Sequence, residues 1–169
     1  MIYNLVDISI WDWYYISMNP NVTPAIIIQY PGLPWNWEGL SLNQSLNRMF
    51  IRDNIDKPWD WEELSNNKNT TLDIIKDYIN KPWDWGYLSS NPNLTLDFVK
   101  KYPGKWNLQL LTENKAFLID DIINNPDMFD LDSLCENSNL CLESFMKLPE
   151  KYRNYQKFSK NPNVTQGFI

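Results

Sequence analysis

Residues 58–81 read PWDWEELSNNKNTTLDIIKDYINK, and residues 82–105 read PWDWGYLSSNPNLTLDFVKKYPGK. The two stretches have the same length and share a Trp-Asp-Trp start, a serine, an asparagine and a Thr-Leu-Asp run. A fixed period of this size is typical of proteins that stack one supersecondary unit after another. The two stretches therefore predict a tandem-repeat protein.

Tryptophan extends the same register over the rest of the chain. All nine tryptophans fall at two positions of the repeat, two residues apart. The first position holds Trp11, Trp35, Trp59, Trp83, Trp106, Phe129 and Tyr152, at intervals of 24 or 23 residues. The second position holds Trp13, Trp37, Trp61, Trp85, Leu108 and Leu131. The spacing predicts one repeat domain over residues 1–169, with a partial copy at 1–10 and seven copies near 11–34, 35–58, 59–82, 83–105, 106–128, 129–151 and 152–169.

An asparagine follows the first aromatic by eight residues in every copy. These residues are Asn19, Asn43, Asn67, Asn91, Asn114, Asn137 and, after one inserted residue, Asn161. If the position needed only a left-handed backbone, glycine would occur in some copies, and it occurs in none. We therefore expect the side-chain amide, which can donate and accept, to bond turn backbone groups within or between copies. A row of ligand-binding amides is the alternative.

Two helices are predicted in each copy. Asp or Asn stands between the two aromatic positions, as at Asp60 and Asn107, and is the residue type that best caps a helix N-terminus. The second helix is expected to begin at a threonine and to stop at punctuation such as Pro103-Gly104. These threonines are Thr23, Thr71, Thr95 and Thr165.

The predicted fold is all-α, an α-solenoid in which each copy has a short first helix, partly 3₁₀, and a longer second helix. Leu118 and Cys141 stand where other copies have the capping threonine. We expect the second helices of those two copies to be less stable.

The tryptophans could form an exposed stacking platform or a packed interior. We favour packing, because the substitutes Phe129, Leu108 and Leu131 are apolar. The first aromatic is expected to pack on the neighbouring copy and the second inside its own copy.

Composition argues against several function classes. The 15 Lys and Arg against 21 Asp and Glu give a net charge of -6, which disfavours nucleic-acid binding. The chain has no histidine, and Cys135 and Cys141 are too few for a zinc site or a disulfide framework. We see neither a signal peptide nor an apolar run of membrane-spanning length. We therefore expect a non-catalytic, intracellular protein in a reducing compartment, with no cofactor, metal, nucleic-acid or membrane partner.

Residues 58–81 and 82–105 resemble the Asn-Pro-Asn repeats in proteins of mimivirus-like giant DNA viruses, and the resemblance covers nearly the whole chain. A more distant likeness is to the bacterial leucine-rich variant repeat, which also has about 24 residues and a turn before its longer helix. That likeness implies a right-handed superhelix of alternating α and 3₁₀ helices. The first resemblance implies location in the host cytoplasm or the virion, and neither implies a catalytic residue.

The repeat predicts a scaffold for an unknown protein partner, because stacked copies hold a surface of variable side chains. The candidate partner-binding residues are Tyr14, Tyr15, Glu38, Glu62, Glu63, Tyr87, Gln109 and Asp132. A virion component that assembles with itself is the alternative. Both ends of the chain fall within a copy, which is expected if the ends fray or the chain is one fragment of a longer array, or if chains associate end to end.

Overall fold

The computed structural model describes residues 8–136 and 140–164, and within these ranges the protein is built of helices and has no β-strand. The chain divides into two compact units, Met1–Asp84 and Trp85–Ile169. The first unit contains η2 (Ile8–Ile10), α1 (Trp13–Met18), α2 (Pro24–Gln29), α3 (Trp37–Leu42), α4 (Arg48–Asp53), α5 (Trp61–Asn66) and α6 (Leu72–Asp77). The second contains α7 (Trp85–Ser89), α8 (Leu96–Lys101), α9 (Leu108–Glu113), α10 (Ile119–Asn124), η3 (Pro126–Met128), α11 (Leu131–Glu136), α12 (Leu142–Lys147), η4 (Glu150–Tyr152) and α13 (Tyr155–Phe158).

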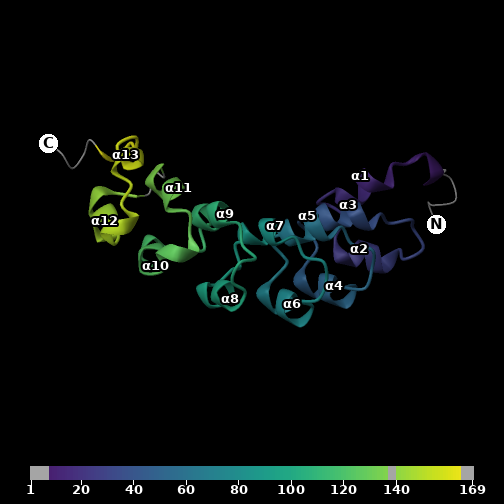
Figure 1. Cartoon of the computed structure of the whole chain (residues 1–169). Helices are drawn as coiled ribbons and strands as arrows, with labels where there is room; N and C mark the ends of the chain where they lie inside the picture. Colours follow the sequence, from purple (N-terminus) through teal and green to yellow (C-terminus); the bar gives the residue numbers. More distant parts are fainter. Residues whose placement is uncertain (1–7, 137–139, 165–169) are drawn as a thin grey trace. The chain divides into compact units, whose positions relative to one another are not determined.

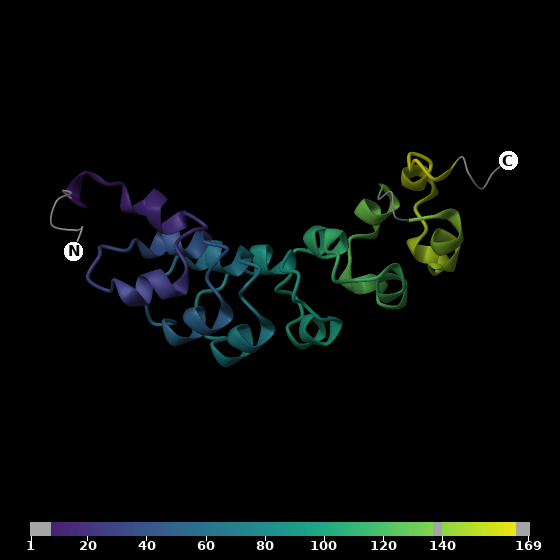
Figure 2. The same ribbon diagram turned by 180° about the vertical axis from the view of Figure 1, so that it is seen from behind.

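Each unit has two layers of helices, as predicted for a solenoid-like all-α repeat. In the first unit, the first helices of successive copies pack side by side, α1 on α3 and α3 on α5, while α2, α4 and α6 form the other layer (Figure 1). In the second unit, α7, α9, α11 and α13 form one layer and α8, α10 and α12 the other (Figure 2).

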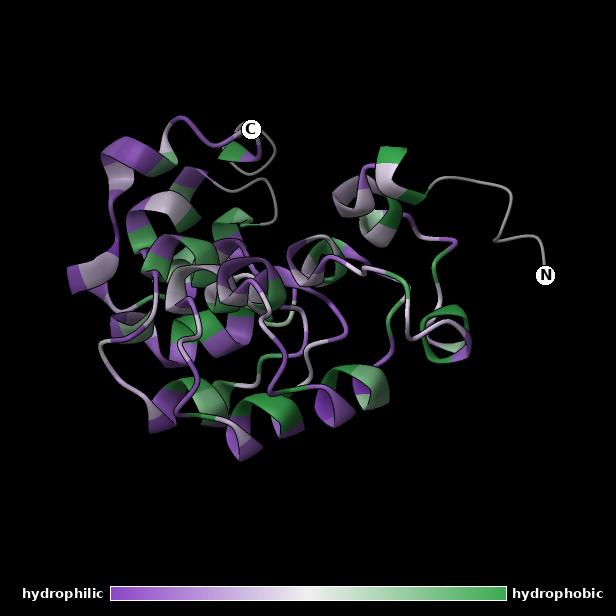
Figure 3. Ribbon diagram, turned by 90° about the vertical axis from the view of Figure 1, so that its right-hand side faces the viewer, coloured by the Kyte–Doolittle hydropathy of each residue, from purple (hydrophilic) through white to green (hydrophobic). Residues whose placement is uncertain are grey.

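The core of each unit lies between its layers. The first helices α3, α5, α7, α9 and α11 each have one fully buried leucine, and these residues are Leu40, Leu64, Leu88, Leu111 and Leu134. Apolar residues of the second helices are equally buried, as at Ile74 and Ile75. Most helices are accordingly apolar on one side and polar on the other (Figure 3). This two-sided pattern is what a helix needs to pack in one layer of a two-layer stack.

The predicted difference in helix length is wrong. α1, α3 and α5 have six residues each, and so do the second helices α2, α4 and α6. The first helices are α-helical, and only the last bond is of 3₁₀ type, as in the 3.2 Å bond from the Asn67 amide to the Leu64 carbonyl. The second helices stay short because the chain turns at once towards the next copy, as it does at Tyr30 before Pro31.

The predicted N-caps are confirmed for the first helices and only partly for the second. The Asp60 carboxylate accepts from the backbone N–H groups of Glu62 and Glu63. Thr95 caps α8, but Thr23 and Thr71 make no side-chain capping bond, although both stand at the N-cap position. Thr71 instead donates its hydroxyl proton to Asp73, which removes the hydroxyl from the helix end. Thr165 lies outside the described residues.

The last copy has a different register from the predicted one. Tyr152 belongs to the 3₁₀ turn η4, and Asn154 is the N-cap of α13. Arg153 therefore occupies the first aromatic position, eight residues before Asn161, and no inserted residue is needed. The sequence did not reveal this position because arginine is not aromatic. The Arg153 side chain nevertheless makes the same kind of hydrogen bond as the indole N–H groups, as described below.

Candidate functional site

The repeated asparagine bonds both within its own copy and to the preceding one. In copy 2, the Asn43 side-chain N–H group donates to the carbonyls of Ser17, Asn19 and Val22 at 2.9 to 3.0 Å. Its side-chain oxygen accepts from the Ser45 amide at 2.8 Å. Asn67, Asn114 and Asn161 make the same two kinds of bond.

We call this series the amide ladder. Asn43, Asn67, Asn91, Asn114 and Asn161 are buried, and Asn19 is exposed. Asn137 lies outside the described residues. A buried amide that serves backbone groups of two copies is committed to structure and leaves no donor for a ligand.

A second ladder, of hydroxyl groups, runs beside the first. The Ser41 hydroxyl donates to the Trp37 carbonyl at 2.8 Å and accepts from the Asp60 backbone N–H of the next copy at 3.0 Å. Ser65, Ser89 and Thr112 do the same. No bond was predicted for this position from the sequence. The nearly constant hydroxyl was the signal that could have revealed the bond.

The tryptophans form a third series, of edge-to-face pairs, which we call the indole rungs. The second-position ring of one copy meets the first-position ring of the next, with centroids 4.9 Å apart for Trp37 with Trp59 and for Trp61 with Trp83. The remaining rungs are Trp13 with Trp35 and Trp85 with Trp106. The predicted contact of the first aromatic with its neighbour is confirmed.

The second aromatic serves both copies, which differs from the prediction that it lies inside its own. Trp37 stacks on Phe50 of its own copy, at 6.3 Å, and also forms the rung with Trp59. Trp11 is more exposed than the other tryptophans, at 51%, because no second-position aromatic precedes it in the described residues.

Each rung is tied to the end of the preceding second helix. The indole N–H of Trp59 donates to the Asn54 carbonyl at 2.8 Å, and that of Trp83 to the Tyr78 carbonyl at 2.9 Å, in both cases five residues back. Arg153 donates its Nε–H to the Leu148 carbonyl at 2.8 Å, again five residues back. Arginine therefore replaces the donor of tryptophan, although it does not replace the ring.

In the first unit, the candidate partner-binding residues lie on the first helices α1, α3 and α5. Tyr15 is 63% exposed and packs edge-to-face on Tyr14, with ring centroids 5.3 Å apart. Partial burial, together with the Glu38 and Glu63 carboxylates, raises the pKa of the Tyr14 phenol. Five of the candidates, Tyr14, Tyr15, Glu38, Glu62 and Glu63, therefore form one surface, which we call the Tyr/Glu face.

In the second unit the candidates are less clustered. Tyr87 is exposed, and Gln109 donates to Glu113 of its own helix. Asp132 accepts from the Asn154 side chain at 2.8 Å, and one of its oxygens lies 3.5 Å from the Lys157 ammonium. Asp132 also lines a pocket.

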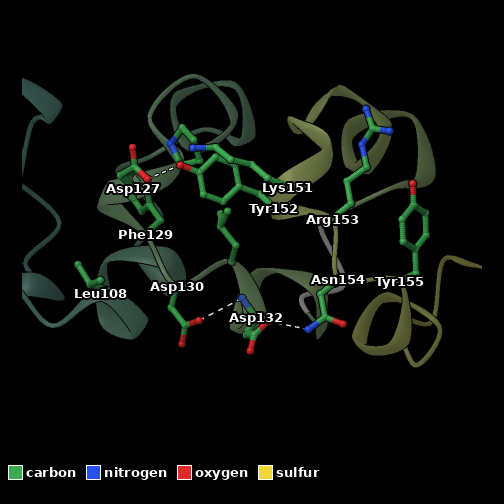
Figure 4. A pocket seen from close by; sticks show the side chains of 12 residues that line it. Leu108, Asp127, Phe129, Asp130, Asp132, Lys151, Tyr152, Arg153, Asn154 and Tyr155 are labelled. Carbon is green, nitrogen blue, oxygen red and sulfur yellow. Dashed lines mark hydrogen bonds between the residues drawn. The ribbon is translucent and has the colours of Figure 1, made fainter.

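That pocket is an open groove of about 770 Å³ beside copies 5 to 7, and Figure 4 shows its side chains. Leu108 lies at one end, and Arg153 and Tyr155 lie at the other. The Tyr152 hydroxyl donates to Asp127, and the Lys151 ammonium lies 4.3 Å from the centre of the Tyr152 ring. The groove was not predicted, although the sequence shows that tryptophan is absent from both repeat positions here.

Charge in the groove is mixed. Burial favours the neutral form of Asp130, but bonds from the Ser133 hydroxyl and from the Ser133 and Asp132 amides outweigh it and lower the pKa of this carboxyl. The Arg153 guanidinium is held by the Leu148 and Met146 carbonyls. Asp127, by contrast, is an exposed carboxylate at the rim of the groove.

Among the residues that the structure describes, no group of three or more His, Cys, Asp or Glu side chains could hold a metal ion. No helix in the same residues is long and apolar enough to cross a membrane. Comparison with protein-family models, with curated proteins and with solved structures gives no match. The resemblance to giant-virus repeats stays a prediction.

Proposed function

We propose that this protein is a non-catalytic scaffold that binds a protein partner through exposed side chains of its first helices. One observation carries the proposal. The asparagines, serines and tryptophans of the repeat are committed to bonds and contacts between copies. Tyr15, Glu38 and Glu62 of the Tyr/Glu face are exposed, and the residues of this face vary from copy to copy. A repeat that fixes its backbone and varies its surface is built for recognition.

The chemistry of the Tyr/Glu face favours a basic partner. Exposed tyrosines supply rigid contact area with a polar tip, and tyrosine is enriched where proteins bind one another. The neighbouring glutamates add negative charge to a chain whose net charge is already -6. Opposite charge on the partner would speed the encounter and orient it.

The proposal is tested by affinity capture with the full chain as bait, and infected cells are the source that the resemblance to giant-virus proteins suggests. The binding variant combines Tyr15→Ala, Glu38→Ala and Glu62→Ala. Its matched control combines Ile28→Ala, Met49→Ala and Lys76→Ala, which are exposed positions on the second helices of the same three copies. We expect one stoichiometric partner, retained by the control and lost by the binding variant.

Two other outcomes would change the proposal. If the control triple loses the partner and the binding variant keeps it, the second helices carry the binding surface. If the chain captures only itself, and sedimentation shows association that increases with concentration, the alternative of a self-assembling virion component is favoured.

A further inference from the structure

The groove lies where the indole rungs stop. The intact rung nearest to it pairs Trp85 with Trp106 at 5.0 Å and 78°. At the next junction, Leu108 replaces the second-position tryptophan and Phe129 the first. Leu108 is 44% exposed, and the buried Phe129 ring pairs with Phe117 instead, at 5.5 Å. The space that an indole occupies in earlier copies is therefore open to solvent here, and it forms part of the groove.

The lysine of the intact rungs is also replaced at this junction, and the Lys151 ammonium of the groove lies over the Tyr152 ring instead. In the intact rungs a lysine just before the first-position tryptophan lies near the second-position ring, with ammonium-to-centroid distances of 5.7 Å for Lys57 over Trp37 and 5.6 Å for Lys81 over Trp61. Lys105 lies over Trp85 in the same way, at 5.9 Å. Two residues before Phe129, where Lys57 and Lys81 stand relative to their own copies, the chain has Asp127. The broken rung thus lacks an indole and has an acid in place of a lysine.

We propose that the groove binds a protein segment that carries a tryptophan next to a lysine or arginine, and that this segment completes the broken rung from outside. The indole packs against Leu108 and the rim around Phe129, and the basic side chain faces the exposed Asp127 carboxylate, which also accepts from the Tyr152 hydroxyl. Both interactions copy pairs that the chain makes within itself, an edge-to-face aromatic contact and a cation close to the ring. This inference rests on the proposed function and specifies its partner.

The test uses the full ¹⁵N-labelled chain and the blocked tripeptide acetyl-Lys-Pro-Trp-amide, which reproduces residues 57–59 and 81–83. We expect saturable amide shifts at Leu108, Asp127 and Phe129, and no comparable shifts with acetyl-Lys-Pro-Leu-amide. Leu108→Trp fills the groove with the chain's own indole and should weaken binding by about tenfold, or about 1.4 kcal/mol. Leu118→Trp places an indole on an exposed position of the same unit, 70% exposed in the wild type, and should leave affinity unchanged.

A second variant, Asp127→Asn, removes a charge with almost no change in side-chain volume, so its effect does not depend on how neighbouring side chains repack. Asp127→Asn should weaken binding of the lysine peptide roughly twofold to fivefold, as expected for an exposed charge pair, and should not affect acetyl-Gln-Pro-Trp-amide. Absence of saturable shifts, equal affinity for the tryptophan and leucine peptides, or normal binding to Leu108→Trp would each overturn the inference. If a captured partner binds Leu108→Trp normally while the Tyr/Glu variant loses it, the groove assignment fails and the scaffold function stands.

Discussion

At the scale of single residues, the asparagine of each copy shows why an amide is kept where glycine would satisfy the backbone alone. The Asn67 side chain donates to carbonyls of the preceding copy and accepts from the Asn69 amide of its own. A carboxylate could accept but not donate, and a hydroxyl is too short to reach both copies. The side chain therefore joins neighbouring copies through a single group.

Replacing Asn67 with alanine should lower the free energy of unfolding by about 1–3 kcal/mol, because buried backbone groups lose their partners. The neighbouring Asn66 is exposed and provides the matched control, for which Asn66→Ala should change stability by less than about 0.5 kcal/mol. Urea denaturation followed by circular dichroism measures both. Equal stability of the two variants would contradict the role of the amide ladder.

Gly39 lies where the first helices α1 and α3 approach each other closely. A Cβ atom added there would lie 2.4 Å from the Tyr14 carbonyl oxygen, which belongs to the backbone and cannot rotate away. Gly39→Ala should therefore destabilise by about 1–3 kcal/mol, the usual cost of overpacking. Gly32→Ala is the control, because nothing lies within 4 Å of a Cβ atom at that site. Thermal melts that coincide for both variants would show that α1 and α3 can separate at little cost.

At the scale of the helix, the N-terminal cap is the feature that sequence predicts best. The Asp or Asn between the two aromatic positions caps the first helix, as Asp60 and Asn107 show, because the cap depends on residues two or three positions away. Helix length and the indole rungs depend on the next copy. They could not be read from local sequence, and Arg153 could not be recognised as a substitute for tryptophan before its bond to Leu148 was seen.

The second helix of copy 5 lacks half of its cap. The Asp121 carboxylate accepts from the Leu118 backbone N–H at 2.9 Å, but the Leu118 side chain has no oxygen to offer in return. Leu118→Thr would complete the reciprocal cap and should stabilise the protein by about 0.5–1 kcal/mol. Leu118→Ala removes the same exposed apolar side chain without supplying an oxygen. A threonine variant no more stable than the alanine variant in urea melts would show that this helix end needs no cap.

Asp130, which caps α11, should make the free energy of unfolding depend on pH in the acidic range. Because the pKa of Asp130 in the folded protein is below its ordinary value of 3.8, the charged carboxylate stabilises the fold above that value, and this contribution is lost as pH falls through the lowered pKa. Asp130→Asn keeps a side-chain oxygen but cannot titrate, so its stability should fall less steeply below about pH 4. Unfolding curves between neutral and acidic pH test this, with Glu136→Gln on the same helix as the control. Parallel acid profiles for wild type and Asp130→Asn would contradict the assignment.

At the scale of the whole molecule, the described residues separate into a repeated set and a variable set. The repeated set holds neighbouring copies together within each unit through the two ladders and the indole rungs. The variable set includes the Tyr/Glu face and the groove. The period in the sequence predicted the bonds of the asparagines and the contact of the first aromatic with its neighbour, but not the hydroxyl ladder. The groove was not predicted, because it depends on residues that differ from the repeat in several copies at once.

A protease-resistance scan of all single substitutions measures this separation directly, because resistance follows the free energy of unfolding and needs no partner. The account predicts loss of resistance for most substitutions at Asn43, Asn67 and Asn114, and tolerance at Tyr15, Glu38 and Glu62. Tolerance at the asparagines, or loss of resistance at the Tyr/Glu face equal to theirs, would contradict the claim that the repeat fixes the backbone and leaves this face free for recognition.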